Sequence, residues 1–284
     1  MIKTMCRLNR MSFSGKIIAI TGGANGLGAE LGRQLKARGA TVVLADIKAA
    51  PGIVRVDVTD HAAMSEFLRA VAWRYGKIDY VFNNAGILRY EESLGSDLSN
   101  WQRVVDVNLM GVVSGSLEAY RLMAKQGSGH IVNIGSMSPL SLFPLFAAYA
   151  TSKAGVLAFS RMLRLEAESS GVNVTVVCPG SIRTDINADY KPSFFTPMIS
   201  VEDAARRILR GVERNQGIVV FPFHAKLFWW LDRIHPALLD PLRRIILGRY
   251  RARKLEPTPT PKALETLAPS TSTSELEEVV HSEQ

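Results

Sequence analysis

The chain has 284 residues, of which 47% are apolar and 21% charged, a composition that excludes a disordered or fibrous protein. The two cysteines, Cys6 and Cys178, lie far apart, which excludes a disulfide framework or a cysteine metal cluster and fits a reducing compartment such as the cytoplasm. The net charge of +8 is uneven, because residues 223–254 hold eight Lys and Arg against two Asp, and residues 255–284 hold six Glu against one Lys. The mildly basic remainder does not indicate a nucleic-acid partner.

Residues 1–13 are predicted to be a short basic leader. No apolar segment follows it, so it is not a secretory signal. The stretch that begins at Met11 looks like a natural start, which predicts that residues 1–10 are dispensable.

A glycine-rich turn follows the first predicted strand. Residues 16–21 are a short β-branched run, which predicts a buried strand, and a helical pattern extends from about residue 29 to residue 37. Between them lie Gly22, Gly26 and Gly28. Strand, glycine turn and helix form the context of a dinucleotide site, because glycines let the backbone approach a pyrophosphate and the helix N-terminus supplies amide groups. The alternative is a plain tight turn.

The second predicted strand, residues 41–46, ends in a carboxylate. Asp46 lies 18 residues beyond Gly28, where an acid can hydrogen-bond a ribose 2′-hydroxyl and would repel a 2′-phosphate. Neither Asn25 nor Ile47 offers an arginine to bind such a phosphate. We therefore expect NAD in preference to NADP, and the alternative is a solvated acid at a strand end.

Strands and helices continue to alternate along residues 14–222, which predicts one α/β domain with a doubly wound, Rossmann-like parallel sheet. The later strands are expected at residues 53–56, 78–82, 129–134, 172–178 and 217–221. The later helices are expected at residues 61–75 (capped by Thr59 or Asp60), 97–124, 149–169 and 200–215.

Tyr149 and Lys153 lie four residues apart in a predicted helix, so they share one helix face. A free tyrosine has a pKa of about 10, and a neighbouring ammonium favours the phenolate and lowers that pKa. The pair is thus a candidate for proton transfer. The alternative is an ordinary surface Tyr and Lys.

Together these motifs resemble those of the short-chain dehydrogenase/reductase family over about residues 14–222. The matching positions are Thr21, Gly22, Gly26 and Gly28; Asp57 and Val58; Asn83, Asn84, Ala85 and Gly86; Asn108; Ser136, Tyr149 and Lys153; and Pro179, Gly180 and Thr184. Gly135 departs mildly from the family, which often has a second serine there.

The resemblance implies a role for each catalytic position. Tyr149 exchanges a proton with the substrate oxygen, Lys153 lowers its pKa and bonds the nicotinamide ribose, and Ser136 bonds the substrate oxygen. Asn108 holds a water that relays protons to Lys153. The implied cofactor-binding residues are Thr21, Gly22, Asn25, Gly26, Leu27, Gly28, Asp46, Asp57, Val58, Asn84, Ala85, Gly86, Tyr149, Lys153, Pro179, Gly180, Ile182 and Thr184. No metal is expected. The resemblance also implies a homo-oligomer, a dimer or tetramer, through the helices at 97–124 and 149–169.

The substrate side is apolar in sequence. The residues concerned are Leu140, Leu142, Phe143, Leu145, Phe194, Phe195 and Met198. They suggest a hydrophobic secondary alcohol or ketone as substrate. Alternatively, several of them pack at an oligomer interface.

Residues 223–254 form a basic, Trp-containing amphipathic extension, in which Asp240 and Pro241 predict a helix start. Charges and prolines interrupt it too often for a transmembrane span. It suits a helix in an anionic membrane interface, or equally one packed on its own protein or on a neighbouring subunit. Residues 255–284, rich in Pro, Thr, Ser and Glu, predict a disordered tail.

Three functions remain in view. The first is an NAD-dependent oxidoreductase in the cytoplasm, with a possible place at a membrane surface. The second is a non-catalytic NAD-binding sensor or scaffold attached to a membrane. The third is a membrane-surface protein that uses the fold as a carrier. The intact set of Ser136, Tyr149 and Lys153 favours the enzyme.

Overall fold

The computed structural model describes residues 12–140, 144–184, 198–222, 230–231, 234–235, 237 and 240–255. The predictions for the first eleven residues, for Leu142, Phe143, Phe194 and Phe195, and for residues 256–284 lie outside this range.

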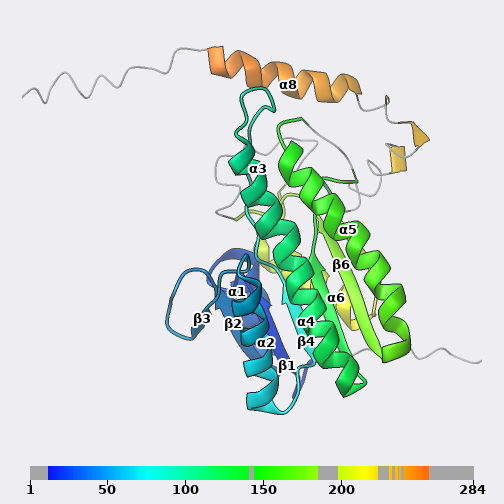
Figure 1. Ribbon diagram of the computed structural model, residues 1–284. Helices are drawn as coiled ribbons and strands as arrows, with labels where there is room; N and C mark the ends of the chain where they lie inside the picture. The colour runs from blue at the N-terminus through cyan, green and yellow to red at the C-terminus, as the bar shows by residue number, and fades with distance from the viewer. Residues whose placement is uncertain are drawn as a thin grey trace, which may run out of the picture. The chain divides into compact units, whose positions relative to one another are not determined.

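Seven parallel strands form one sheet in the order β3-β2-β1-β4-β5-β6-β7, which confirms the doubly wound prediction (Figure 1). The strands are β1 (Ile17–Thr21), β2 (Thr41–Asp46), β3 (Ile53–Arg55), β4 (Tyr80–Asn83), β5 (Gly129–Ile134), β6 (Val172–Pro179) and β7 (Ile218–Phe221). The strand order reverses between β1 and β4, so the crevice at their carboxyl ends is the expected ligand site.

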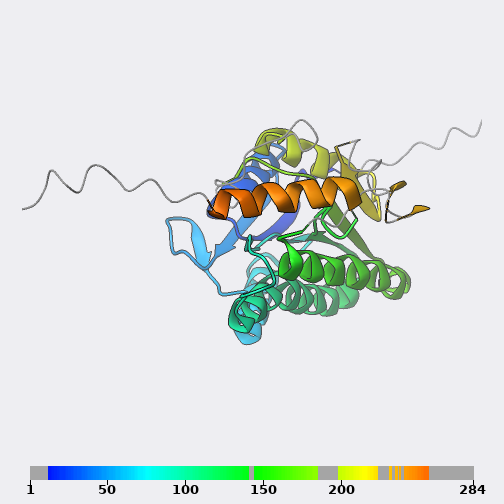
Figure 2. The same cartoon turned by 90° about the horizontal axis from the view of Figure 1, so that it is seen from above.

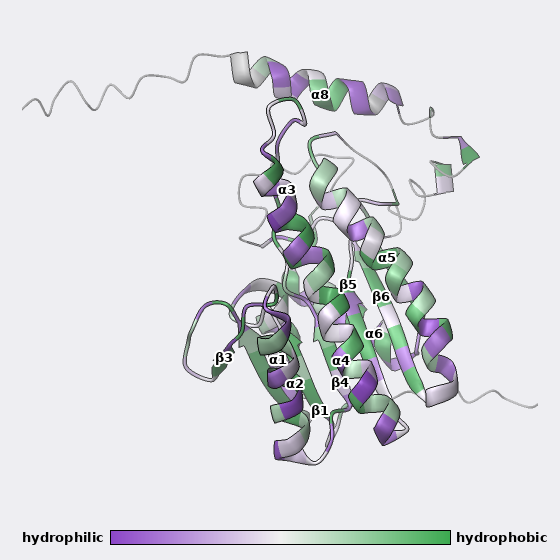
Figure 3. Cartoon of the chain, in the orientation of Figure 1, coloured by the Kyte–Doolittle hydropathy of each residue, from purple (hydrophilic) through white to green (hydrophobic). Residues whose placement is uncertain are grey.

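Helices cover both faces of this sheet (Figure 2). The helical segments are α1 (Gly26–Lys36), α2 (His61–Tyr75), α3 (Leu98–Val105), the π-helix η1 (Asp106–Met110), α4 (Gly111–Gln126), α5 (Ala147–Ala167), the 3-10 turn η2 (Glu168–Ser170), α6 (Val201–Glu213) and α8 (Asp240–Leu255). One apolar cluster joins the sheet to α1 and α6, and another joins it to α2, α4 and α5. Figure 3 shows the strands as mainly hydrophobic, as burial on both faces requires.

The predicted helix at 97–124 is the clearest difference between sequence and structure. It is three consecutive segments, because the π-helical turn η1 separates α3 from α4. Sequence periodicity cannot show such an insertion, since the polar and apolar pattern continues through it. π-Helical turns often occur at functional sites, and η1 contains Asn108.

Side-chain caps begin several helices as predicted. Asp60, rather than Thr59, caps α2 by accepting hydrogen bonds from Ala62 N and Ala63 N. Ser200 caps α6 through Asp203 N. In α1, by contrast, Asn25 makes no side-chain cap.

The chain divides into two compact units, residues 1–243 and 244–284, and α8 crosses the boundary between them. None of the described helices is both long and apolar enough to cross a bilayer.

Candidate active site

The glycine turn between β1 and α1 packs closely against the end of β4. Thr21 Oγ1 accepts hydrogen bonds from the backbone amides of Asn84 (3.1 Å) and Ala85 (3.2 Å). The Asn84 side chain in return donates to Thr21 O (2.9 Å) and Gly22 O (3.0 Å). A Cβ at Gly22, where φ is +66°, would lie 2.8 Å from Ala85 Cα. Only glycine fits here, so the backbone and not a side chain faces the crevice.

This turn fits a pyrophosphate. A Cβ at Gly28 would collide with Gly22 O, and Gly26 has a φ of +54°. Because no side chain caps α1, its first amide groups remain for an anion, where the helix dipole is also favourable. Thr184, 158 positions later in the chain, meets the same turn, since a Cβ at Gly26 would lie 3.4 Å from its methyl group.

Asp46 is held in a defined position at the end of β2. Its carboxylate accepts hydrogen bonds from Ala24 N (3.1 Å) and Lys48 N (3.0 Å). The acid is thereby fixed beside the glycine turn, as a ribose hydroxyl partner should be. Asp57 differs, because its carboxylate accepts hydrogen bonds from Thr59 N and Oγ1 within its own turn. Val58 is buried.

Asn108 is fully buried in η1 and is bonded to the backbone across the crevice. Its Oδ1 accepts from Ile87 N and its Nδ2 donates to Ile87 O, both at 2.8 Å. Its Nδ2 also lies 3.3 Å from Ser152 Oγ on α5. The π-turn therefore joins the loop after β4 to α5. Gly86 in this loop lies beside both Asn108 and Lys153, since a Cβ there would lie 3.2 Å from Asn108 Oδ1 and 3.6 Å from Lys153 Nζ.

The structure brings Ser136, Tyr149 and Lys153 together. Ser136 follows β5, and its side chain lies close enough to the Tyr149 hydroxyl on α5 to lower the pKa of that tyrosine. Lys153 Nζ lies 5.7 Å from the centre of the Tyr149 ring and donates a hydrogen bond of 2.8 Å to Ile134 O. The shared helix face predicted for Tyr149 and Lys153 is confirmed.

The electrostatics differ from the expectation in one respect. Burial raises the pKa of Tyr149, and the nearby Ser136 side chain opposes this only in part. Burial also lowers the pKa of Lys153 to about 8. The net pKa of Tyr149 is thus raised, because removing the phenolate from water has the largest effect, and Lys153 is not among the causes of this shift.

The residues after β6 line the other side of the crevice. Pro179 ends β6, and Pro179 O accepts a hydrogen bond from Met137 N (2.9 Å). Gly180 N donates to Phe221 O (2.8 Å). Ile182 is buried and forms a parallel bridge with Ile199.

Cys178 is a residue whose contact with the site sequence reasoning missed. Cys178 is fully buried, and the backbone N–H of Ser136 lies close enough to lower the pKa of its thiol. Burial has the larger effect and raises this pKa to about 12, so the thiol is neutral. The available signal was its place at the end of β6, the strand adjacent to the one that leads to Ser136.

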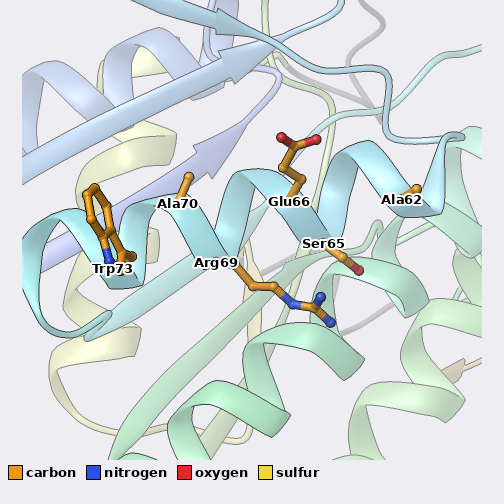
Figure 4. Close-up of a pocket in the computed structure, with 6 residues that line it drawn as sticks. All are labelled: Ala62, Ser65, Glu66, Arg69, Ala70 and Trp73. Atoms are coloured by element: carbon orange, nitrogen blue, oxygen red, sulfur yellow. The ribbon is translucent and has the colours of Figure 1, made fainter.

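A separate hollow lies on the outer side of α2 (Figure 4). Its lining residues are Ala62, Ser65, Glu66, Arg69, Ala70 and Trp73. All come from one helix and none belongs to the crevice, so this hollow is not the candidate active site. Among the described residues there is also no group of three or more His, Cys, Asp or Glu that could hold a metal ion.

The chain is similar in sequence to known proteins. The sequence model of the short chain dehydrogenase family matches residues 16–193. A "3beta-hydroxysteroid dehydrogenase 1" of Eggerthella lenta is 33% identical over 192 residues, which cover 62% of this chain and 74% of that protein. A "Probable oxidoreductase EphD" of Mycobacterium tuberculosis is 35% identical over 192 residues, but the match spans only 32% of that longer protein.

A solved structure is also similar. It is a short chain dehydrogenase from Burkholderia cenocepacia in complex with NADP, 28% identical, with a TM-score of 0.73 over 82% of this chain and 99% of the other. The fold, the glycine turn and the group of Ser136, Tyr149 and Lys153 agree with these similarities. The chain belongs to the short chain dehydrogenase family.

Proposed function

We propose that this protein transfers a hydride between NAD and a hydrophobic secondary alcohol or the corresponding ketone. The observation that carries this proposal is the meeting of Ser136, Tyr149 and Lys153 beside a glycine turn suited to a dinucleotide. An NAD-binding sensor would need the turn but not the hydroxyl pair.

The residues of the chain supply binding, orientation and proton transfer. A bound nicotinamide would supply the hydride acceptor or donor. Because its pKa is raised, Tyr149 is protonated at neutral pH and can donate to a carbonyl oxygen. Ser136 lies beside the Tyr149 hydroxyl, and its single O–H can donate to the substrate oxygen as charge develops there. Lys153 uses one of its three N–H donors on Ile134 O, which leaves two for a ribose.

The preference for NAD is supported by Asp46. Its carboxylate is fixed by Ala24 N and Lys48 N and would repel a 2′-phosphate. The next residue, Ile47, is half exposed and offers no positive charge. The similar Burkholderia structure contains NADP, so the preference needs a direct measurement.

The hydrophobic substrate is supported by the side chains near Ser136 and Tyr149 in sequence. Leu140 and Leu145 are each 5% exposed. The name of the Eggerthella relative refers to a hydroxysteroid, an apolar secondary alcohol. Phe146, three residues before Tyr149, packs against Tyr90 with ring centres 4.9 Å apart, which adds aromatic surface.

A kinetic panel tests both the preference for NAD and the hydrophobic substrate. Initial rates with NAD and NADP should be compared over sterols, long-chain secondary alcohols and small polyols. We expect the highest kcat/KM with NAD and an apolar alcohol. A higher kcat/KM with NADP would contradict the first part, and a preference for polyols the second.

We also propose that the protein acts at the cytoplasmic surface of a membrane through residues 223–254. Residues 240–255 hold six Lys and Arg against one acid, and Ile245 in α8 is 53% exposed. Such a helix suits an anionic interface. Flotation of the full chain with vesicles of anionic and of zwitterionic lipid tests this, with Ile245→Glu as the variant that should reduce binding. Equal recovery of both proteins would contradict the proposal.

A dimer or tetramer through α4 and α5 completes the proposal. Leu117 on α4 and Met162 and Leu165 on α5 are between 37% and 66% exposed. Analytical ultracentrifugation of Leu165→Glu against the unchanged protein tests whether these helices pair, and an unchanged mass would contradict it.

A further inference from the structure

A chain of buried side-chain hydrogen bonds runs from the middle of the sheet to α5. Asn83 Nδ2 donates to Ser116 Oγ (3.0 Å) and to Asn133 Oδ1 (2.8 Å). Ser116 Oγ also donates to Asn133 Oδ1 (3.1 Å). Asn133 Nδ2 donates to Ser160 Oγ (2.9 Å), and Ser160 Oγ donates to Val156 O (2.6 Å). These bonds connect β4, α4, β5 and α5.

The four side chains are almost completely removed from water. Asn83 is 2% exposed, Ser160 is 1% exposed, and Ser116 and Asn133 are fully buried. A net hydrogen bond contributes only about 1 kcal/mol, and well-packed apolar side chains could replace such a network at little cost. Its stability alone therefore does not explain it. Asn83 Oδ1 has no hydrogen-bond partner among the described residues, but the other side-chain groups of the network are paired. Those bonds require one relative position of their partners, because a shift would leave further buried groups unpaired.

The network meets α5 seven residues beyond Lys153. Seven residues are about two helical turns, so Lys153 and Ser160 lie on the same face of α5. Both are bonded to neighbouring residues of β5, Lys153 Nζ to Ile134 O and Ser160 Oγ to Asn133 Nδ2. Strand β5 thus holds α5 at two points along one line.

The packing around these two points is close. A Cβ at Gly115 would collide with Asn83 Oδ1, and a Cβ at Gly155 would lie 2.8 Å from Leu109 of η1. The first glycine lets α4 approach the network, and the second lets α5 approach the π-turn that carries Asn108. Helix α5 is therefore positioned by its contact with η1 at Gly155 and by its bond to the network at Ser160.

We propose that the hydrogen bonds from Asn83 through Ser116 and Asn133 to Ser160 position α5 along its axis, and thereby set the placement of Tyr149 and Lys153 against Ser136. Ser160 is the positioning residue at the end of this network and itself touches none of the three. The proposal rests on the proposed function, because it assigns proton transfer to Tyr149.

A matched pair of variants tests the proposal. Ser160→Ala removes one buried hydroxyl from the network. Thr175→Val removes another fully buried hydroxyl, which donates to Gln216 O (2.7 Å) and contacts His130 Nε2 (2.8 Å) on the same sheet, but which is not bonded to α5. Both variants should lower the melting temperature. Only the first should disturb the site.

Two readouts separate positioning from stability. The Lys153 pKa can be followed by NMR titration of ¹³C-labelled lysine methylenes, with Lys153→Met for assignment. In Ser160→Ala we expect this pKa to move from about 8 toward its ordinary value, because a shifted α5 admits water. We also expect kcat to fall roughly tenfold with KM changed less than about threefold, the signature of lost alignment. Thr175→Val should leave both readouts unchanged.

A second network variant, Ser116→Ala, keeps the proposal testable if Ser160→Ala does not fold. Ser116→Ala leaves the Asn133–Ser160 bond in place, so it should shift the Lys153 pKa in the same direction but less. The proposal is overturned if Ser160→Ala lowers the melting temperature as Thr175→Val does while the Lys153 pKa stays unchanged. If the unchanged protein converts no alcohol in the panel, the proposed function fails, and the titration still decides the positioning role.

Discussion

Polar groups are arranged in opposite ways at the two ends of the parallel strands, called here the amino edge and the carboxyl edge of the sheet. At the amino edge, Asp79 accepts hydrogen bonds from Lys16 Nζ, Lys77 Nζ and Ile17 N, so its charge is fully compensated within the protein. At the carboxyl edge, the first amides of α1 have no side-chain cap. There Lys153 is buried and Tyr149 is half-buried, and desolvation shifts both pKa values so that the neutral forms are favoured. The first arrangement holds the fold together, and the second keeps groups available for a ligand.

The largest effect is expected from removal of the Tyr149 hydroxyl. Tyr149→Phe should reduce kcat by about 10³-fold, the usual contribution of a positioned acid or base, while cofactor binding persists. Tyr120→Phe is the matched control, because its hydroxyl contacts Ser170 Oγ (3.1 Å) and Glu166 O (3.3 Å) away from the crevice. Turnover is measured by absorbance of the reduced cofactor and binding by fluorescence titration. Equal losses of kcat in both variants would show that the Tyr149 hydroxyl has no larger role in turnover than the Tyr120 hydroxyl.

The next effect concerns acid stability through His130, a buried β5 residue. Burial lowers the pKa of His130 from 6.5 to about 3. Because the unfolded chain binds this proton more readily, the stabilisation is complete above pH 6.5 and is lost as the pH falls toward 3, by up to about 5 kcal/mol. Urea unfolding at several pH values should show a weaker pH dependence for His130→Gln than for the unchanged protein. Parallel curves would show that His130 does not carry this acid sensitivity.

Cofactor choice should respond to the carboxylate of Asp46. Asp46→Ser combined with Ile47→Arg should reduce kcat/KM with NAD by roughly 10- to 100-fold, since a charged hydrogen bond of about 1.5–3 kcal/mol is lost, and should raise it with NADP. Ile47→Arg alone is the control and should improve NADP less. The measurement is the ratio of kcat/KM for the two cofactors, and an unchanged ratio would exclude Asp46 from cofactor selection.

The smallest effect is expected at the amino edge itself. Asp79→Asn keeps the shape but weakens the bonds to Lys16 and Lys77, which are partly exposed, so unfolding should become easier by about 1 kcal/mol. Denaturant unfolding measures this loss. The kcat and KM values should stay within about twofold, because Asp79 lies at the opposite end of the strands from Tyr149. A large loss of activity without a loss of stability would show that the amino edge also takes part in function, and would contradict the contrast between the two edges.

Local sequence determined most of the fold and half of the site. Short β-branched runs, glycines and cap residues act over a few positions, so the seven strands, the turn with Gly22 and Gly28, and the caps at Asp60 and Ser200 were predictable. Spacing alone also placed Tyr149 and Lys153 on one helix face.

Tertiary structure decided the rest, because burial and long-range contacts depend on all elements together. Three features join segments that are distant in sequence. They are the bonds of Asn108 in the π-turn to Ile87, the proximity of Ser136 N to Cys178, and the approach of Thr184 to Gly26. The raised pKa of Tyr149 has the same origin, since desolvation depends on everything that excludes water from the phenol. The sequence thus identified which side chains could perform the chemistry, and only the packed structure decided their protonation and their alignment.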